Sequence, residues 1–375
     1  MLRRRLKKSG RMLSILGFGC MRLPETPDGR IDEETATSMV RYAIDNGVNY
    51  FDTGYTYHNG ESEPFLGRAL REGYRERVSI ATKLPVWKIE SREDMDRYLD
   101  EQLARLRTDH IDFYLLHGLG RRLWEKMQDL GVTEFLDCAL DDGRICHAGF
   151  SFHDSERVFR RIVDSYDWTF CQIQFNFMDT AYQAGTAGLR YAAEQGLGVV
   201  VMEPLRGGLL AKPLAGADRI RSESGFHGTA AEWGLRWVWD HPEVTVVLSG
   251  MSTQEQVRQN ILYADSGRPN TLTDRELAVY DEIRSLYRKR TKVPCTQCGY
   301  CMPCPSGVDI PACLAIYNDA YMYDDRETAR FVYRVFSRSG GDAARCRDCG
   351  ICEDLCPQHI SIRQVLADER KLLEE

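Results

Sequence analysis

Eight short apolar runs, separated by segments with helical character, occupy the first two thirds of the chain and constrain its fold more than any other feature. From residue 111 onward these runs show no polar–apolar alternation, as expected of parallel strands that are covered on both faces. The eight runs are residues 15–19, 49–51, 78–82, 111–116, 145–150, 170–175, 197–202 and 245–248. Eight strand–helix units in roughly 250 residues match the size of a closed (β/α)8 TIM barrel.

An open, doubly wound α/β sheet would give a similar alternation of strands and helices. A nucleotide-binding sheet of that kind carries a G-x-G-x-x-G sequence directly after its first strand. No such sequence follows residues 15–19. We therefore predict an α/β protein whose main domain is the TIM barrel.

The length of 375 residues is long for one domain and suits two. A polar stretch at residues 267–270, which contains Pro269, indicates a boundary. We predict a barrel over residues 1–266, a connecting helix over 267–290 and a small, mainly α-helical domain over 291–375. The net charge of −7 argues against nucleic acid as the main partner.

The chain starts with the basic sequence MLRRRLKKSGR, and no apolar stretch of signal-peptide length follows it. No run of the sequence is long enough to span a bilayer. We expect a solvated, frayed N-terminus, no membrane partner and a cytoplasmic location.

Four polar side chains that suit proton transfer follow three of the apolar runs. Asp52 and Tyr57 follow the second run, Lys83 follows the third and His117 follows the fourth. Such groups are costly beside buried strands unless they are paired or hydrogen-bonded. Because the carboxyl ends of barrel strands open onto one face, the catalytic face of such barrels, we expect the four side chains to meet there.

These four residues match, in order and spacing, the catalytic tetrad of the aldo-keto reductases, and the chain resembles that family from about residue 14 to about residue 265. The segments GFGCMRLP, GFS and EPLRGG, together with Gln172, extend the resemblance on both sides of the tetrad. The resemblance implies the barrel fold, an oxidoreductase activity and a small-molecule substrate with a carbonyl or related group.

The resemblance also implies a role for each member of the tetrad. Tyr57 is the expected proton donor, and Lys83 is expected to lower its pKa from the ordinary value of about 10. Asp52 is expected to pair with Lys83 and keep it charged, and His117 to orient the substrate oxygen or share the proton. Taken singly, the same residues would fit an ordinary ion pair and a buried core histidine. Their recurrence at matching strand ends favours catalysis.

The family binds an extended nicotinamide dinucleotide across the barrel mouth, which implies carboxamide contacts from Ser151 and Gln172. Two residues depart from the family pattern near the ring. Phe152 stands where asparagine is usual, and Met202 stands where an aromatic residue often stacks. A thioether can lie against a ring, so Met202 is compatible with stacking.

The pyrophosphate is expected at the loop 204–208, where glycines permit close approach of the backbone, although the same RGG sequence also fits a simple turn. The 2′-phosphate is expected at residues 249–252 and the next helix N-terminus. Gly250 and Gln256 replace the lysine and arginine that are common there, so NADPH and NADH both stay open as cofactors. The residues expected to contact the dinucleotide are Cys20, Met21, Ser151, Gln172, Met202, Pro204, Leu205, Arg206, Gly207, Ser249, Gly250, Met251, Gln256 and Asn260.

Nine of the 13 cysteines lie between residues 295 and 356, and such clustering in a cytosolic chain indicates metal rather than disulfides. The first run is Cys295-x2-Cys298-x2-Cys301-x2-Cys304-Pro305, and the second is Cys346-x2-Cys349-x2-Cys352-x3-Cys356-Pro357. The second run has the spacing of bacterial ferredoxins with [4Fe–4S] clusters. The first run has two residues between its third and fourth cysteines, where the second run has three.

In two-cluster ferredoxins three close thiolates hold one cluster and the fourth, before proline, reaches the other. We therefore assign one cluster to Cys295, Cys298, Cys301 and Cys356, and the other to Cys346, Cys349, Cys352 and Cys304. Zinc is the alternative, since C-x2-C pairs also build zinc sites, but two runs that each end in Cys-Pro favour iron–sulfur. The spacer is predicted to form helices at 310–322 and 327–336, resembling α-helical ferredoxins that pass single electrons. Cys313 is interpreted as a packing thiol.

Three functions stay open from the sequence. The first is NAD(P)H-dependent reduction of a carbonyl, with clusters that relay electrons. The second is a reductase fed through the clusters by a ferredoxin or flavoprotein, with a decayed nicotinamide site. The third is a non-catalytic redox-sensing subunit, which the intact tetrad argues against.

Overall fold

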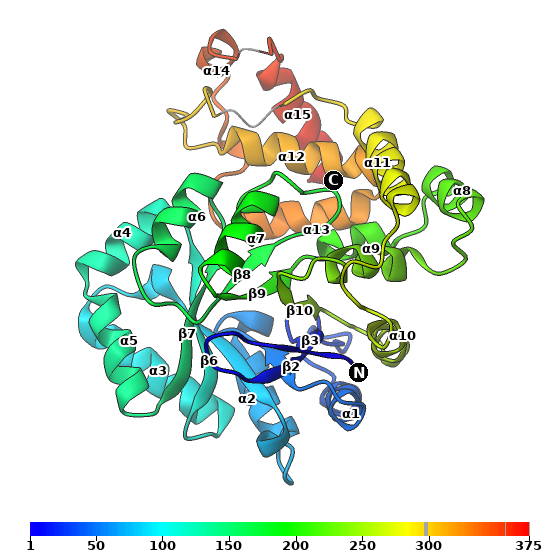
Figure 1. The fold of residues 1–375 in the computed structure, drawn as a ribbon. Helices are drawn as coiled ribbons and strands as arrows, with labels where there is room; N and C mark the ends of the chain where they lie inside the picture. Colours follow the sequence, from blue (N-terminus) through cyan, green and yellow to red (C-terminus); the bar gives the residue numbers. More distant parts are fainter. Residues whose placement is uncertain (296–298, 357, 375) are drawn as a thin grey trace. The chain divides into compact units, whose positions relative to one another are not determined.

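The computed structural model describes residues 1–295, 299–356 and 358–374 (Figure 1). The chain forms two compact units. The first comprises Met1–Gly207 and Ala231–Leu272, and the second comprises Gly208–Ala230 and Thr273–Glu375. The domain limits predicted at residues 266 and 290 stay a proposal. No helix among the described residues combines the length and the apolar character that crossing a bilayer requires.

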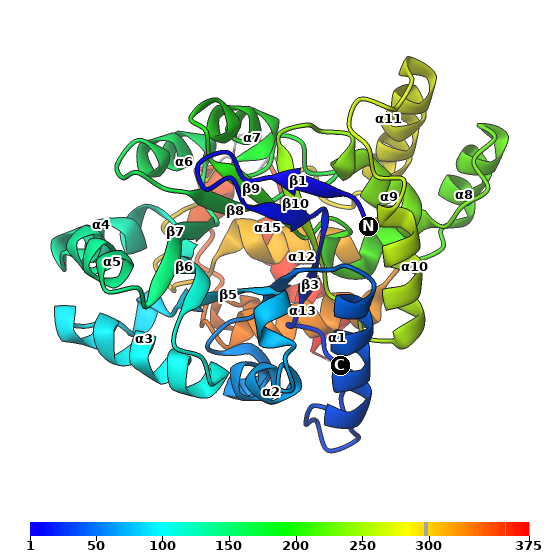
Figure 2. The ribbon, with the colours of Figure 1, turned by 60° about the horizontal axis from the view of Figure 1, so that its bottom comes forward.

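Within the described residues, eight parallel strands close into the predicted barrel in the order β10-β3-β4-β5-β6-β7-β8-β9. Figure 2 shows the helices α1 to α7 around the outside of these strands. The strands are β3 (Leu16–Gly19), β4 (Tyr50–Asp52), β5 (Ser79–Leu84), β6 (Ile111–Leu119), β7 (Ile145–Phe152), β8 (Phe170–Gln174), β9 (Gly198–Met202) and β10 (Val244–Ser249). The helices of this region are α1 (Glu33–Asp45), α2 (Ser62–Ala69), α3 (Arg92–Leu106), α4 (Arg121–Asp129), α5 (Val132–Asp141), α6 (Glu156–Val163), α7 (Gly185–Glu194), α9 (Ala230–Trp239) and α10 (Gln254–Ala264).

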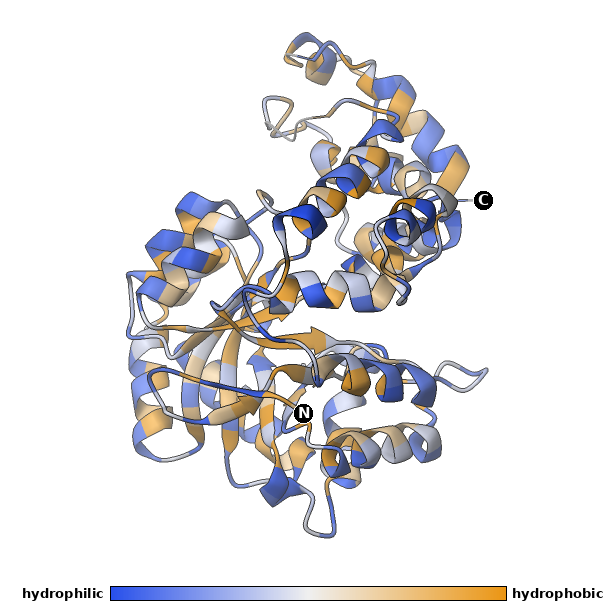
Figure 3. Ribbon diagram, turned by 45° about the vertical axis from the view of Figure 1, so that its right-hand side comes forward, coloured by the Kyte–Doolittle hydropathy of each residue, from blue (hydrophilic) through white to orange (hydrophobic). Residues whose placement is uncertain are grey.

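The interior of the barrel is packed with large apolar side chains, including Tyr50, Phe113 and Phe170, all fully buried. In Figure 3 the strands are coloured as mostly hydrophobic and the outer helices as mixed. Strands buried on both faces have this composition because helices cover their outer side.

The N-terminus is not the solvated, frayed segment that its basic composition suggested. It forms an antiparallel hairpin of β1 (Arg3–Arg5) and β2 (Met12–Ser14). Leu6 and Leu13 are buried in the same apolar cluster as the barrel interior. Arg4 donates hydrogen bonds to backbone carbonyl oxygens in the segment that leads into β10. Apolar burial and carbonyl acceptors therefore outweigh the solvation of the basic side chains.

The helices α10 and α11 both begin after a threonine cap, but the two caps differ. At the start of α11 (Asp274–Lys289), Thr273 and Glu276 form the reciprocal box. At the start of α10, the Thr253 side chain accepts a hydrogen bond from the backbone N–H of Gln256. The Gln256 side chain, however, accepts a hydrogen bond of 2.7 Å from the backbone N–H of Ser252, one residue before the cap.

The second unit is mainly α-helical, and the helices predicted at 310–322 and 327–336 are present. Its apolar core includes Val308, Leu314 and Leu366, and the fully buried Cys313 packs within this core. The helices of the unit are α8 (Ala215–Glu223), α11, α12 (Ile310–Met322), α13 (Arg326–Ser337), α14 (Ile351–Asp354) and α15 (Ile362–Leu373).

Candidate functional site

The four tetrad residues come together at the carboxyl ends of three neighbouring strands. Parallel pairing places Asp52, the last residue of β4, opposite Ala81 of β5. Lys83 Nζ donates to Asp52 Oδ1 at 2.7 Å and to the carbonyl oxygen of Thr53 at 2.6 Å. The same Nζ lies 4.8 Å from the centre of the Tyr57 ring, and the centre of the His117 ring lies 6.0 Å from that of Tyr57.

Burial governs the electrostatics of this group. Burial would lower the pKa of Lys83, but the charges of Asp52 and Tyr57 outweigh it and raise the pKa above its ordinary value. Lys83 therefore stays protonated. Burial raises the pKa of Tyr57, and the opposing charge of Lys83 does not cancel that rise. The net lowering of the Tyr57 pKa that the sequence suggested is therefore not found.

His117 is neutral in this setting. Burial, reinforced by the positive charge of Lys83, holds the pKa of His117 well below its ordinary value of 6.5. A neutral imidazole can donate one hydrogen bond but is a poor acid at neutral pH. Among the described residues its buried Nδ1 has no hydrogen-bond partner.

Sequence reasoning missed Trp87, whose ring centre lies 5.0 Å from that of His117. Its side chain is 42% exposed, although it is large and apolar. An exposed aromatic ring beside the tetrad offers an apolar surface to a substrate. The short distance along the chain from Lys83 is the only signal that could have identified it.

The two predicted carboxamide contacts lie on adjacent strands, since Ser151 of β7 pairs with Gln172 of β8. The Ser151 hydroxyl oxygen accepts a hydrogen bond of 2.7 Å from the backbone N–H of Gly118. Among the residues that the structure describes, this hydroxyl donates to no acceptor, so its own proton is available to a carbonyl oxygen. Within the described part of the chain, the buried Gln172 Oε1 has no hydrogen-bond partner. A nicotinamide carboxamide has a carbonyl oxygen that accepts hydrogen bonds and an NH2 group that donates them. The Ser151 hydroxyl suits the first and Gln172 Oε1 suits the second.

Phe152 and Met202 depart from the family pattern near the expected nicotinamide ring, and their surroundings explain how each side chain is placed. Phe152 is fully buried, and its ring meets that of Phe159 edge-on with centres 5.1 Å apart. It belongs to the packing between β7 and α6, so it is not available for a polar contact. The sulfur of Met202 lies 3.6 Å from Gln172 Nε2, which places Met202 beside the carboxamide contacts.

The cation expected at the pyrophosphate loop is already engaged. Arg206 begins the short 3-10 helix η4 (Arg206–Ala211), and its Nη1 forms an ion pair with Asp179 at 3.2 Å. At the loop after β10, Asn260 Nδ2 donates to the Ser249 hydroxyl at 2.8 Å. These contacts stabilise the conformations of the loops after β9 and β10.

The remaining predicted contacts differ in their exposure to solvent. Cys20 and Met251 are buried, whereas the Met21 side chain is 53% exposed. Pro204 is buried and Leu205 is half-buried at the start of the loop that follows β9.

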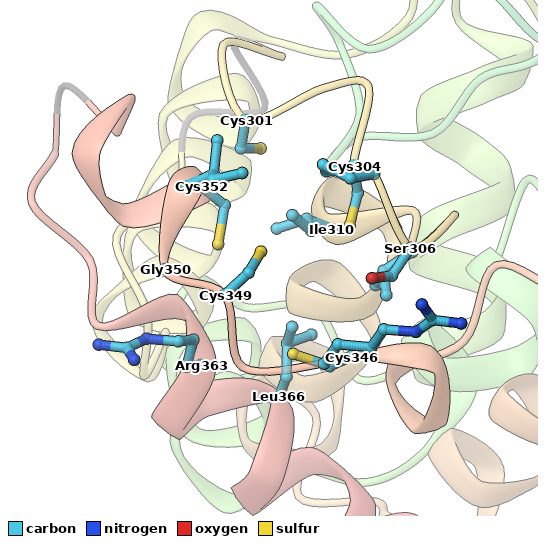
Figure 4. A pocket seen from close by; sticks show the side chains of 14 residues that line it. Cys301, Cys304, Ser306, Ile310, Cys346, Cys349, Gly350, Cys352, Arg363 and Leu366 are labelled. Atoms are coloured by element: carbon cyan, nitrogen blue, oxygen red, sulfur yellow. The ribbon is translucent and has the colours of Figure 1, made fainter.

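In the second unit, a pocket with an empty volume of about 370 Å³, part of it open to solvent, has five cysteines among its lining residues (Figure 4). Cys304, Cys346, Cys349 and Cys352 face a shared space, with Cys301 at its edge. The apolar side chains of Ile310 and Leu366 complete the wall. The first four are the residues that the ferredoxin spacing assigned to one cluster, three from one run and the fourth from the other. Four thiols around an apolar pocket suit an iron–sulfur cluster, although no three ligating side chains of the described residues lie close enough together to hold a single metal ion.

The other predicted cluster is only partly described. Cys295, Cys301 and Cys356 pack against the same apolar core as Cys304, Cys346 and Cys352 of the first set. Cys298, the fourth ligand predicted for this cluster, lies outside the described residues, as does Pro357 of the second Cys-Pro pair.

Comparison with known families matches the two parts of the chain separately. Residues 15–284 match the aldo/keto reductase family, and residues 294–360 match a 4Fe-4S dicluster domain. The Bacillus subtilis protein described as uncharacterized oxidoreductase YrpG is 28% identical over 283 residues, which covers 61% of this chain and 82% of that protein.

Solved structures of aldo-keto reductases match about three quarters of the chain. The holo form of the aldo-keto reductase AKR11C1 from Bacillus halodurans superposes with a TM-score of 0.63 and 27% identity, covering 75% of this chain and 96% of that one. An aldo-keto reductase from Klebsiella pneumoniae, solved in complex with NADPH, has a TM-score of 0.59 and 24% identity, covering 76% of this chain and 96% of its own.

Proposed function

The chain belongs to the aldo/keto reductase family, and we propose that this oxidoreductase reduces the carbonyl group of a small molecule with NADPH or NADH. The observation that carries the proposal is the meeting of Tyr57 and His117 with the buried Lys83–Asp52 pair. Tyr57 supplies a proton donor, Lys83 a charged group and His117 a neutral hydrogen-bond donor. This combination suits carbonyl reduction better than any structural role.

Each residue of the tetrad has its own role in the reduction. When bound, the nicotinamide supplies a hydride to the carbonyl carbon. Tyr57 gives its phenolic proton to the carbonyl oxygen, so that hydride and proton together convert the carbonyl to an alcohol. Lys83, kept charged by Asp52, stabilises the phenolate that remains on Tyr57. His117 donates a hydrogen bond to the same oxygen and does not compete as an acid.

The carboxamide of the dinucleotide would be held by Ser151 and Gln172. The Ser151 hydroxyl would supply a donor to the carboxamide, and Gln172 Oε1 would supply an acceptor. A buried acceptor without a partner costs roughly 1–3 kcal/mol, so the unpartnered Gln172 Oε1 supports a ligand that donates to it.

We propose that the second unit holds two [4Fe–4S] clusters that relay single electrons. The donor of these electrons is a ferredoxin or a flavoprotein in this proposal. A chain rich in metal-binding thiols suits the reducing cytoplasm. The ligands would be Cys304, Cys346, Cys349 and Cys352 for one cluster, and Cys295, Cys298, Cys301 and Cys356 for the other.

A second candidate is a reductase that receives its electrons only through the clusters. The pairing of Arg206 with Asp179 favours it, because that pairing removes a cation from the expected pyrophosphate loop. The exchange of the usual phosphate-binding cations for Gly250 and Gln256 points the same way.

Titration of the anaerobically prepared protein with NADPH and NADH separates the two candidates. We expect both dinucleotides to bind below millimolar concentration, detected by their fluorescence, while the cluster absorbance is recorded in parallel. Gln172→Ala is expected to weaken both by roughly two- to tenfold, the worth of one hydrogen bond. If neither dinucleotide binds at millimolar concentration and a reduced ferredoxin bleaches the clusters, the second candidate replaces the first.

A further inference from the structure

Helix α15 carries an acid on the face that packs into the core of the second unit. The buried residues of this helix are Ile362, Leu366, Glu369 and Leu373, at the three- and four-residue spacing of one helix face. Glu369 is fully buried, and among the residues that the structure describes neither of its carboxyl oxygens has a hydrogen-bond partner. An apolar residue would fill the same position without the cost of burying an unpartnered acid, so the acid calls for a role.

The position of Glu369 on the helix places it next to the cysteine pocket. Leu366, one turn earlier on the same face, lines that pocket together with four of the predicted cluster ligands (Figure 4). Three residues along a helix correspond to a rise of about 4.5 Å. Leu366 and Cys313 also belong to the apolar core against which the cysteines pack. Glu369 is therefore part of the apolar surroundings of the proposed cluster and not one of its ligands.

The surroundings of the Glu369 carboxyl favour its neutral form. Burial raises the pKa of this group to about 8, the Cys313 thiol opposes the rise, and the charges of Glu374 and Asp342 add to it. The Cys313 thiol donates a hydrogen bond of 3.7 Å to the carbonyl oxygen of Gly341. The carboxyl thus stays in an apolar site in which any change of nearby charge acts on it strongly.

The titratable groups that face Glu369 come from every element around it, and none of them carries a positive charge. The Tyr333 hydroxyl donates to Glu374 at 2.9 Å, so the carboxylate of Glu374 is held beside this core. The facing groups are Cys313 and Tyr317 of α12, Tyr333 of α13, Asp342 before the short helix η5 (Ala343–Arg345) and Glu374 after α15.

Reduction of a neighbouring cluster would change the charge that Glu369 experiences. A [4Fe–4S] cluster gains one negative charge when it takes up an electron, and in an apolar interior such a charge disfavours a nearby carboxylate. The reduced cluster therefore makes Glu369 bind a proton more tightly. Because coupling between two sites is reciprocal, the bound proton makes the cluster easier to reduce.

We propose that Glu369 is the proton acceptor that accompanies reduction of the cluster held by Cys304, Cys346, Cys349 and Cys352. One electron passes from the ferredoxin or flavoprotein donor to the cluster, and one proton passes from water to the Glu369 carboxylate. Oxidation of the cluster reverses both transfers. This inference rests on the proposed iron–sulfur function of the second unit.

The midpoint potentials of both clusters, measured against pH on the whole anaerobically reconstituted chain, test this proposal. Absorbance and electron paramagnetic resonance follow the reduction. In the wild type, one potential is expected to be level below about pH 7, where Glu369 is protonated in both redox states, and to fall as the pH rises through about 8. The fall is expected to reach at most about 59 mV for each tenfold decrease in proton concentration, the value for one proton per electron.

Two variants remove the titrating group and keep the core filled. Glu369→Gln is expected to give a level potential over the whole range, near the low-pH value of the wild type. Glu369→Leu is expected to give a level profile as well, so a folding defect in one variant leaves the other as a test. Asp368→Asn is the matched control, because that carboxylate accepts from Gln364 at 2.9 Å, and it is expected to keep the wild-type slope.

Iron content and thermal unfolding check that each variant is folded and loaded. A wild type with both clusters and level potentials overturns the inference alone, and so does a slope that survives in Glu369→Gln. Loss of the slope in Asp368→Asn also overturns it, because the effect would then not be specific to Glu369. A reconstituted wild type without [4Fe–4S] clusters overturns the proposed function of the second unit and this inference together.

Discussion

Replacement of Tyr57 by phenylalanine is expected to lower kcat/KM for carbonyl reduction by roughly 100- to 10,000-fold, the usual worth of a positioned general acid. The dissociation constant for NADPH is expected to change by less than about twofold, because the substitution removes a proton and no binding surface. The rate of NADPH oxidation with an aldehyde substrate and the fluorescence of bound NADPH measure the two quantities.

Tyr55→Phe is a matched control, because Tyr55 lies two residues away and its hydroxyl donates to Glu101 at 3.2 Å, outside the tetrad. That variant is expected to keep the wild-type rate. Unchanged turnover in Tyr57→Phe would show that another group gives the proton. An equal loss in both variants would show that the loop, and not the phenol of Tyr57, is what matters.

The assignment of Tyr57 as the proton donor also determines how the reduction rate of the wild type depends on pH. The protonated phenol is the active form, and burial raises the pKa of Tyr57, so the active form persists as the pH rises. His117 is already neutral at neutral pH, because burial lowers its pKa. The reduction rate is therefore expected to stay level between pH 7 and pH 9, both well below the ordinary tyrosine pKa of about 10.

Replacement of Cys349 by alanine is expected to remove one of two clusters, lowering the iron content from about eight to about four per chain. Cys349 lines the pocket that it shares with Cys304, Cys346 and Cys352. Iron analysis and the absorbance of anaerobically reconstituted protein measure the loss.

Cys313→Ala is the control for this experiment, because Cys313 is buried in the apolar core and is assigned to neither cluster. It is expected to keep the full iron content, even if the cavity lowers the free energy of unfolding. Stoichiometric zinc with no iron in the reconstituted wild type would contradict the cluster assignment.

Much of the barrel could be predicted from the sequence, because buried parallel strands leave a repeated apolar signal and residues at their carboxyl ends converge. That geometry predicts that Lys83 and Asp52 lie close together, and the family resemblance predicts that they pair. The grouping of Cys304 with Cys346, Cys349 and Cys352 follows from ferredoxin spacing, which already encodes the exchange of a ligand between runs.

Other features depend on which group a long side chain contacts in the folded chain, and no sequence pattern indicates that contact. The ion pair of Arg206 with Asp179 is one such feature, and the expected contact of Arg206 with the dinucleotide stays a prediction. The direction of the Tyr57 pKa was also missed, since it depends on how deeply the ring is buried and not on its neighbours in sequence.

The most direct test of the central claim follows a labelled hydride. NADPH carrying deuterium at the transferable position of its ring is mixed, without oxygen, with the protein and a panel of aldehydes and ketones, and the alcohol products are examined by mass spectrometry. The account predicts deuterium on the former carbonyl carbon with wild-type protein and a large loss of labelled product with Tyr57→Phe. Alcohol formed without deuterium, and only when a reduced ferredoxin is supplied, would contradict it.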